Sequence, residues 1–456
     1  MKCVIFGTGN FYSIYKRYIP CEDVLFLIDN NEKKWGKRID DKEIVNPATA
    51  DYDQCDFIII MIMQYKAVSE QLITLGVPAE KIKSYHDLRQ LCGLTAKVMT
   101  PQGNISICEW KRRCTEKSIL VCSHEFSRTG VPVALMHVCM MLKEMGYHVL
   151  FTALLGGTFE QELQEKEIDY LTDLELFYED KQFLNELKMF DLFFLGSIVT
   201  SKFGMAIASF NKPVVWWLHE SDINAYHNFK LVMAENISYF AVGKRVVKRF
   251  NEFYPKGHIK ELCYFLPDAD YVGRSKNNKI TFAVIGSINR RKAQDIFVEA
   301  IKHIKPELVE RAQYVIVGAY RTSDFYFDLQ SELENNPNLV WIDEMSQEEV
   351  KQFYESVDVL VCPSRDDPLP IVVTQALQNG IPCIISDEVG QSEYIIKGKG
   401  GMVFPSENVK MLADAMTQYI ENEQLIEKSN VEAKKIFESH FSEQKMRGNL
   451  EQIILI

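Results

Sequence analysis

Short apolar runs alternate with helical stretches along most of this chain, and this alternation constrains the fold more than any other feature. A first series starts near residue 118, and the same alternation begins again after a polar stretch at 273–279. Apolar runs separated by amphipathic helices are typical of parallel sheets covered on both faces. We therefore predict an α/β fold with two similar lobes. The predicted strands are residues 119–122, 148–152, 192–195, 214–218 and 239–242 in the first lobe, and 281–285, 314–317, 340–342, 359–361 and 383–385 in the second.

The domain boundaries follow from this pattern. We predict a first lobe over residues 118–268 and a second over 269–456. If their sheets face each other, the carboxyl ends of the strands line one shared cleft, which is where ligands of α/β proteins bind. Residues 94–117 lack periodicity and carry a Pro-Gln-Gly-Asn turn at 101–104, so we predict a linker there.

Residues 1–93 read as a small Rossmann-like α/β module. Apolar residues 3–6 lead into Gly7-Thr8-Gly9, and a second apolar run at 24–28 leads into Asp29, the spacing of a βαβ opening. Gly7, Gly9 and Asp29 are candidates to hold a nucleotide. The third glycine is missing, however, and the module is only half of a dinucleotide fold, so we expect structural support or docking of a protein partner.

Composition and charge narrow the function. The 456 residues include 51 Lys and Arg against 63 Asp and Glu, a formal charge of −12, which argues against a nucleic-acid-binding protein. The 11 cysteines are odd in number and contain no C-x-x-C pair, as expected in a reducing compartment. The longest apolar run, 57–63, is far shorter than the roughly 20 residues that span a bilayer. We predict a cytoplasmic protein, either free or held peripherally at the inner face of the membrane.

The most informative stretch is 357–385. An apolar strand ends in Pro363-Ser364, and Asp366-Asp367-Pro368-Leu369-Pro370 leads into a helix that carries Gln375. An acid at a strand end can accept hydrogen bonds from sugar hydroxyls, and a helix N-terminus offers free amides and a positive dipole to a diphosphate. The alternative to a ligand-binding site is an ordinary strand-to-helix turn whose polar residues face solvent.

This stretch resembles the nucleotide-sugar site of the retaining GT-B glycosyltransferases of family 4, also called group 1. In that family an acidic residue precedes a proline turn, and after seven intervening residues a Glu is followed by A-x-x-x-G-x-P. Here Asp367 takes the first acidic position, and Gln375 replaces the second Glu before Ala376, Gly380 and Pro382. The resemblance implies that Asp367 binds the donor sugar, that Gln375 binds the ribose more weakly than Glu would, and that Leu369, Pro370 and Val372 lie at the donor.

A second segment, 285–292, resembles the family's glycine turn, whose Arg and Lys neutralise the diphosphate leaving group. Gly286 matches the turn and Lys292 matches the Lys, whereas Ser287 occupies the Arg position. Arg290 or Arg291 must then supply the second positive charge. A basic helix start is otherwise most often a solvated surface.

Three further residues are implied by the same resemblance. Gly390 and Glu393 lie in a segment similar to the family's G-G-x-x-E turn near the donor sugar, with Val389 in place of the first glycine. Gly130 follows the first strand of the first lobe, where the family's glycine loop approaches the donor phosphate. His219 follows the strand at 214–218, and the matching His in relatives contacts donor sugar and acceptor.

The resemblance implies a retaining sugar transfer from a nucleoside-diphosphate sugar to a glycan or lipid-linked glycan, with Lys292, Asp367 and His219 as the catalytic residues. No cofactor or metal is expected, since the nucleotide sugar is the substrate and Lys292 with an arginine neutralises the diphosphate. Capsule, exopolysaccharide or other cell-surface glycan assembly is the expected setting, and the last helix is expected to cross back to the first lobe. A non-catalytic GT-B partner protein is the main alternative, whereas a nucleotide-sugar epimerase is disfavoured because the motif is that of a transferase.

Overall fold

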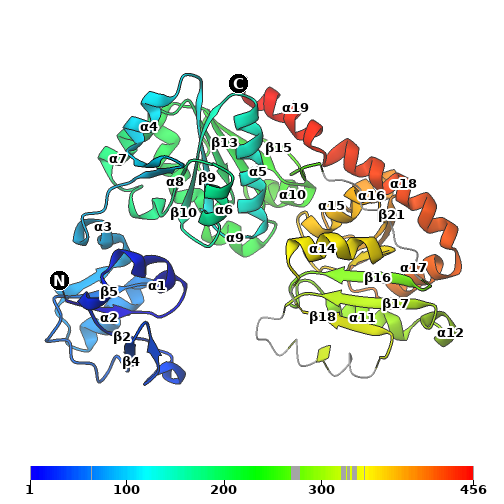
Figure 1. Cartoon of the computed structure of the whole chain (residues 1–456), viewed down its shortest axis with the longest axis horizontal. Coiled ribbons are helices and arrows are strands. Elements are labelled where there is room, and N and C mark those ends of the chain that lie inside the picture. The colour runs from blue at the N-terminus through cyan, green and yellow to red at the C-terminus, as the bar shows by residue number, and fades with distance from the viewer. Residues whose placement is uncertain are drawn as a thin grey trace. The chain divides into compact units, whose positions relative to one another are not determined.

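The chain forms two compact α/β units, shown in Figure 1. The computed structural model describes residues 2–62, 64–268, 278–319, 325, 329–330, 336–343 and 345–454. Unit 1 comprises Met1–Phe194 with Lys202–Lys212, and unit 2 comprises Leu195–Ser201 with Pro213–Ile456. The predicted boundary at 268/269 borders residues 269–277, which lie outside the described residues, and the predicted domain limits remain predictions.

The N-terminal module of unit 1 contains the predicted βαβ opening. Its six-stranded sheet has the order β3-β4-β2-β1-β5-β6, in which only β3 runs antiparallel to its neighbour. All four residues of β1 are buried, as expected for a central strand covered on both faces. The elements are β1 (Cys3–Phe6), α1 (Asn10–Tyr15), β2 (Val24–Ile28), β3 (Arg38–Ile39), β4 (Lys42–Val45), β5 (Phe57–Ile60), α2 (Tyr65–Thr74), β6 (Ile82–Ser84) and α3 (Leu88–Leu91).

Contacts inside the module explain its turn residues without a nucleotide. Gly7 has φ +100°, and a Cβ there would lie 2.6 Å from the Ile62 side chain. Asp29 accepts hydrogen bonds from the Thr8 hydroxyl at 2.5 Å and from Lys34 Nζ at 2.8 Å. Burial alone would raise the pKa of Asp29, but the hydrogen bonds from Lys34 and Thr8 outweigh it and lower the pKa. These contacts hold the turn in place within the module, and its predicted role in structural support or docking remains a prediction.

The module is joined to the rest of unit 1 by a buried carboxylate. Asp173, which is fully buried, pairs with Arg17, accepts a hydrogen bond from the Tyr18 hydroxyl, and accepts a third from the Gly156 amide at 2.7 Å. Arg17 also pairs with Glu160 at 3.0 Å. Asp173 adopts a left-handed conformation with φ +57°, which costs a non-glycine residue about 1–3 kcal/mol and persists only where the surroundings enforce it.

The stretch predicted as a linker has structure of its own. β7 (Val98–Thr100) and β8 (Gly103–Ile105) form a hairpin, β7 pairs antiparallel with β11, and α4 (Ile107–Arg113) follows. Three-residue strands are too short to show an alternation in the sequence, which explains why only the turn at 101–104 was evident. In unit 1 the strand order is β12-β9-β10-β11-β7-β8. The other elements here are β9 (Ser118–Glu125), α5 (Gly130–Glu144), β10 (His148–Leu155), α6 (Glu160–Glu165), β11 (Tyr170–Leu171), α7 (Lys181–Leu187), β12 (Leu192–Gly196) and α8 (Ser201–Ile207), the last two crossing the division between the units.

Unit 2 contains two sets of parallel strands. The first has the order β15-β14-β13-β12, and the second is a six-stranded parallel sheet of order β18-β17-β16-β19-β20-β21. The alternation read from the sequence is confirmed, with strand ends differing by a few residues. The strands are β13 (Val214–Leu218), β14 (Ile237–Ala241), β15 (Ile259–Glu261), β16 (Ile280–Ile285), β17 (Ala312–Val317), β18 (Leu339–Ile342), β19 (Val359–Cys362), β20 (Cys383–Ser386) and β21 (Gly401–Phe404). The helices are α9 (Ile223–Asn228), α10 (Lys244–Phe253), α11 (Gln294–Lys302), α12 (Pro306–Val309), α14 (Gln347–Phe353), α15 (Ile371–Gln378), α16 (Ser392–Gly398), α17 (Val409–Glu421), α18 (Glu423–His440) and α19 (Glu443–Ile454).

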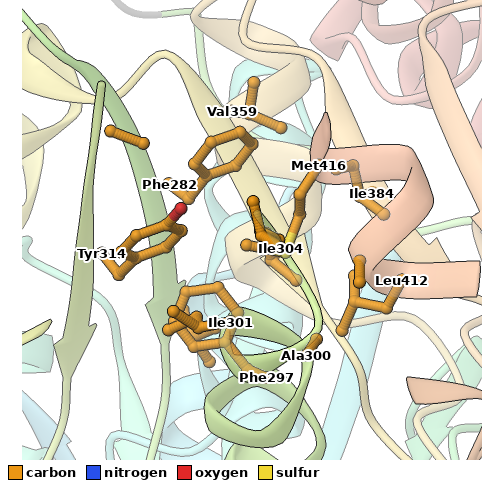
Figure 2. Packing of buried hydrophobic residues seen from close by; sticks show 14 of the residues in the cluster. Phe282, Phe297, Ala300, Ile301, Ile304, Tyr314, Val359, Ile384, Leu412 and Met416 are labelled. Atoms are coloured by element: carbon orange, nitrogen blue, oxygen red, sulfur yellow. The ribbon is translucent and has the colours of Figure 1, made fainter. Parts of the chain in front are cut away.

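The hydrophobic core of unit 2 fixes the carboxyl ends of β16 and β19. Figure 2 shows Phe282 and Tyr314 of neighbouring strands packing toward Phe297 of α11 and Met416 of α17. The Phe282 and Tyr314 rings are stacked, with centroids 5.8 Å apart. Because this core is closely packed, the loops that leave β16 and β19 start from rigid positions. In the described parts of the chain, none of the helices combines the length and the hydropathy that a membrane span requires.

We expect the Arg17→Met substitution to lower the free energy of unfolding by about 2–4 kcal/mol, because it leaves the buried Asp173 carboxylate without its cation. The matched control is Lys16→Met at the neighbouring position, where an exposed ion pair with Asp40 contributes at most about 1 kcal/mol. Urea unfolding of both variants measures the difference. Equal effects would contradict a supporting role for the Arg17–Asp173 pair.

Candidate donor site at the strand ends of unit 2

The turn after β16 presents the predicted basic residues. Gly286 has φ +146°, Asn289 Oδ1 accepts a hydrogen bond from the Lys292 amide at 3.1 Å, and Ala293 has φ +57°. In the family pattern that this segment resembles, the residue after the Lys is a glycine, and here it is Ala293. The left-handed conformation favours glycine and costs Ala about 1–2 kcal/mol, so this turn holds an alanine at a cost in strain.

Lys292 and Asp367, both predicted as catalytic residues, lie side by side in the structure. Lys292 Nζ lies 2.6 Å from Asp367 Oδ2, and the Asp367 carboxylate is nearly buried. Arg291 Nη1 lies 3.3 Å from the same oxygen, whereas the Arg290 carbonyl accepts a hydrogen bond from Arg365. Of the two arginines considered from the sequence, Arg291 is thus the one whose guanidinium the structure places beside Lys292 and Asp367.

The position of the family's arginine is filled differently. Ser287 is exposed, and its carbonyl accepts a hydrogen bond at 3.1 Å from Nε2 of Gln294, which is fully buried. The buried Gln294 side chain therefore holds the backbone of this turn. The positive charge comes from Arg291 and Lys292, which follow Ser287 in the chain.

The turn after β19 is joined to the turn after β20 by two backbone hydrogen bonds. Asp367 donates its amide to the Glu388 carbonyl at 3.1 Å, and the Gly390 amide donates to the Asp367 carbonyl at 2.9 Å. A Cβ on Gly390 would lie 1.6 Å from the Pro368 carbonyl oxygen. Gly390, predicted as a donor-binding residue, therefore has a structural requirement of its own, since only glycine permits this approach.

The start of α15 carries the remaining residues of the motif. Pro370 caps the helix, and its carbonyl accepts a hydrogen bond from Gln391 at 3.0 Å. The Gln375 side-chain oxygen accepts from the Tyr354 hydroxyl at 3.4 Å, and that hydroxyl also donates to the Val372 carbonyl at 3.0 Å. Burial raises the pKa of Tyr354 well above its usual value, so the hydroxyl remains a donor. Leu369 is buried beside this helix start.

Glu393 and His219 are each held by neighbours within unit 2. The half-exposed Glu393 carboxylate pairs with Lys244 and with Lys397 at 3.4 Å, and the hydrogen bond from Lys244 lowers the pKa of Glu393. The His219 ring lies edge-on to the Trp217 ring, with centroids 4.4 Å apart. The backbone amide of His219 donates a hydrogen bond to Glu220 Oε2 at 3.1 Å. Both remain predicted site residues.

Gly130 belongs to unit 1 and is the first residue of α5. Just before it, the Ser127 hydroxyl lies 2.6 Å from Glu125 Oε1. The predicted role of Gly130 at the donor phosphate remains a prediction.

Sequence reasoning missed three residues that the structure brings to this site. Asp366, Ser221 and Arg245 form one hydrogen-bonded group directly beside Asp367. The signals were present as an Asp-Asp doublet at a strand end and a basic pair that opens the helix at 244–253. A doublet does not reveal which partner each carboxylate takes, because the partners lie more than a hundred residues away. Among the described residues, no cluster of three or more His, Cys, Asp or Glu has the arrangement of a metal site.

Comparison with known proteins first identifies the fold. Solved structures share the fold, among them Anabaena HepE in complex with UDP and glucose, with a TM-score of 0.62, 15% identity, and coverage of 74% of this chain and 99% of that one. The chain therefore has the GT-B fold of glycosyltransferases.

Family models give the more specific assignment. Residues 270–436 match the model described as glycosyl transferases group 1, and residues 115–252 match glycosyl-transferase family 4. The chain belongs to this group 1, family 4 class of glycosyltransferases. Residues 1–83 match a separate model, C2185-like, N-terminal, so the extra module is distinct from the transferase fold.

Curated relatives match over shorter segments. An Escherichia coli UDP-Gal:α-D-GlcNAc-diphosphoundecaprenol α-1,3-galactosyltransferase is 22% identical over 181 residues, which is 39% of this chain and 44% of that protein. The Staphylococcus aureus capsular polysaccharide biosynthesis glycosyltransferase CapM is 24% identical over 183 residues, which is 39% of this chain and 46% of that protein. The chain thus matches about a third to just under half of the length of these and the other first relatives.

We expect Gly390→Ala to destabilise unit 2 by about 1–3 kcal/mol, because the new methyl group overlaps the Pro368 carbonyl and forces the two turns apart. The control is Gly448→Ala in α19, where nothing lies within 4 Å of the added Cβ and helix propensity favours Ala by about 0.5–1 kcal/mol. Thermal unfolding should shift in opposite directions in the two variants. Equal melting temperatures would contradict the close approach.

Proposed function

We propose that this protein transfers a sugar from a nucleoside-diphosphate sugar to a glycan or lipid-linked glycan, with retention of the anomeric configuration. The observation that carries the proposal is the group of Lys292, Arg291 and Asp367 at the start of α15. Two cations and a helix N-terminus suit a diphosphate, and the nearly buried carboxylate suits sugar hydroxyls. The UDP and glucose bound in the HepE structure support a nucleotide-sugar donor.

The site suggests how Lys292 is kept ready for a diphosphate. Without a ligand, its ammonium is neutralised by Asp367 at 2.6 Å, so neither charge is buried alone. A bound diphosphate competes for Lys292 and Arg291, and Asp367 then accepts hydrogen bonds from the donor sugar. The turn needs no large rearrangement, because Asn289 and Gln294 already fix its backbone.

The chemistry that fits these residues is a front-face substitution. The bond between the anomeric carbon and the diphosphate oxygen breaks, the acceptor oxygen bonds to the same face of that carbon, and the acceptor proton passes to the departing diphosphate. Lys292 and Arg291 stabilise the negative charge that develops on the leaving group. The proposed role of His219 is to orient donor sugar and acceptor from the end of β13.

The acceptor and the setting are inferred from the relatives. The E. coli and S. aureus proteins are named for a diphosphoundecaprenol-linked acceptor and for capsule synthesis. We propose a cell-surface glycan as the product, with cytoplasmic or peripheral membrane localisation and with no cofactor or metal ion required.

A non-catalytic GT-B protein is the second candidate, and Gln375 is the observation that favours it. The amide replaces the family's carboxylate and is already engaged by Tyr354 at 3.4 Å. Calorimetry with UDP-, GDP- and dTDP-sugars separates the two functions, since an enzyme must bind at least one of them. Failure of all three families of nucleotide sugar to bind would favour the non-catalytic protein.

We expect Lys292→Gln to weaken binding of the preferred nucleoside diphosphate about ten- to hundredfold, because a charge-assisted contact of about 1.5–3 kcal/mol is lost while an amide still faces Asp367. Lys302→Gln at the end of α11 is the matched control, since Lys302 is exposed and pairs with Glu299 of the same helix at 2.9 Å. Calorimetric titration of both variants gives the comparison. Unchanged affinity in Lys292→Gln would remove Lys292 from the site.

We expect the first-formed product to keep the anomeric configuration of the donor, because no carboxylate nucleophile or opposite-face base is needed when the leaving group takes the acceptor proton. Proton NMR during the first turnover distinguishes the α and β anomers by the coupling between H1 and H2 of the transferred sugar. An inverted product would contradict the front-face mechanism while leaving sugar transfer itself established.

A further inference from the structure

Asp366, one residue before Asp367, is held by side chains that follow β13 and β14. The Ser221 hydroxyl donates to its carboxylate, at 2.9 Å from Oδ1 and 3.1 Å from Oδ2. Arg245 donates to Oδ1 from Nη2 at 2.7 Å and from Nε at 3.2 Å. Ser221 is buried, and the Arg245 and Asp366 side chains are only 23% and 32% exposed, so solvent screens this group incompletely.

Arg245 also reaches the turn after β20. Its Nη1 pairs with Glu388, whose carbonyl accepts the Asp367 amide at 3.1 Å. One guanidinium thus pairs with two carboxylates, one on the turn that carries Asp367 and one on the turn after β20 that accepts the Asp367 amide. We call Arg245, Ser221, Asp366 and Glu388 the Arg245 clamp.

The backbone at the start of α10 approaches the same turn closely. A Cβ on Gly243 would lie 3.3 Å from the Pro368 carbonyl oxygen. Arg249 donates to the Ser221 carbonyl at 2.8 Å, which holds Ser221 in place under Asp366. The clamp is therefore supported from one side by α10 and from the other by Arg291, which donates to the Asp366 carbonyl at 2.9 Å.

We propose that Arg245 is a positioning residue for the donor sugar, acting through Asp366 and Glu388 on the carboxylate of Asp367. The inference rests on the proposed function and adds a residue outside the recognised donor motif. Without Arg245, the Asp366 and Glu388 carboxylates lose their shared cation, and like charges close together repel. The two turns then separate, and Asp367 leaves the position in which it faces the sugar.

This mechanism has a distinctive signature. Asp367 is proposed to bind the sugar, whereas the diphosphate is proposed to bind to Lys292, Arg291 and the helix start. The clamp contacts Arg291 through the backbone carbonyl of Asp366, which the substitutions of Arg245 and of the Asp366 side chain leave in place. Loss of the clamp should therefore weaken binding of the nucleotide sugar more than binding of the nucleoside diphosphate alone. A general loss of structure would weaken both alike.

The test compares Arg245→Gln, Asp366→Asn and the double variant with Lys248→Gln, an exposed position on the same helix. For Arg245→Gln we expect a loss of about tenfold in affinity for the preferred UDP-, GDP- or dTDP-sugar, and less than about threefold for the matching diphosphate. We expect Arg245→Lys to recover part of the loss and Lys248→Gln to behave as wild type. Because the two residues act as one unit, the double variant should lose clearly less than the product of the single losses.

Other outcomes overturn the inference. Equal losses for nucleotide sugar and diphosphate, unchanged affinity for both, or effects of Arg245→Gln and Asp366→Asn that simply multiply would each exclude positioning through the clamp. If the wild-type protein binds no nucleotide sugar, the proposed function fails and this inference with it. A double-mutant cycle on urea stability then still shows whether the Arg245–Asp366 pair is energetically coupled.

Discussion

Two adjacent carboxylates, Asp366 and Asp367, organise the strand ends of unit 2. Each takes its own cation: Asp366 takes Arg245, which follows β14, and Asp367 takes Lys292, which follows β16. Neighbouring carboxylates that are partly removed from water are costly unless each is neutralised. The loops after β13, β14, β16, β19 and β20 are therefore held together by charge at the point where a ligand of an α/β sheet binds.

Most of the parallel strands were predictable, because buried strands such as β16 are continuous apolar runs in the local sequence. The two turns that carry Lys292 and Asp367 were also recognisable in the sequence, whereas the ion pair between these residues is known only from the structure. The hairpin of β7 and β8 was not predictable, since three-residue strands carry no periodicity. The partners of Asp366 were not predictable either, because Ser221 and Arg245 are brought to it by the packing of whole elements and not by spacing along the chain.

The departures from the family pattern have different physical consequences. Ala293 replaces the family's glycine and adopts a left-handed conformation, which costs a non-glycine residue strain. Ser287 removes a charge that Arg291 supplies from another position beside Asp367. The replacement of Glu by Gln375 has the largest expected effect on hydrogen bonding, because an amide accepts a weaker hydrogen bond than a carboxylate. The Gln375 oxygen also already shares the Tyr354 hydroxyl with the Val372 carbonyl. In the proposed donor site, these replacements would place more of the recognition on the diphosphate and sugar than on the ribose.

The buried Asp173 also bears on how chains of this kind can be recombined. Its partners Arg17 and Tyr18 lie in the N-terminal module, whereas the carboxylate lies more than a hundred and fifty residues later. A chimera that exchanges the first 93 residues for those of another protein must bring its own cation and hydroxyl to this position, or replace Asp173 by an apolar residue. The module and Asp173, which follows β11, are therefore coupled through one buried charge, although they match separate family models.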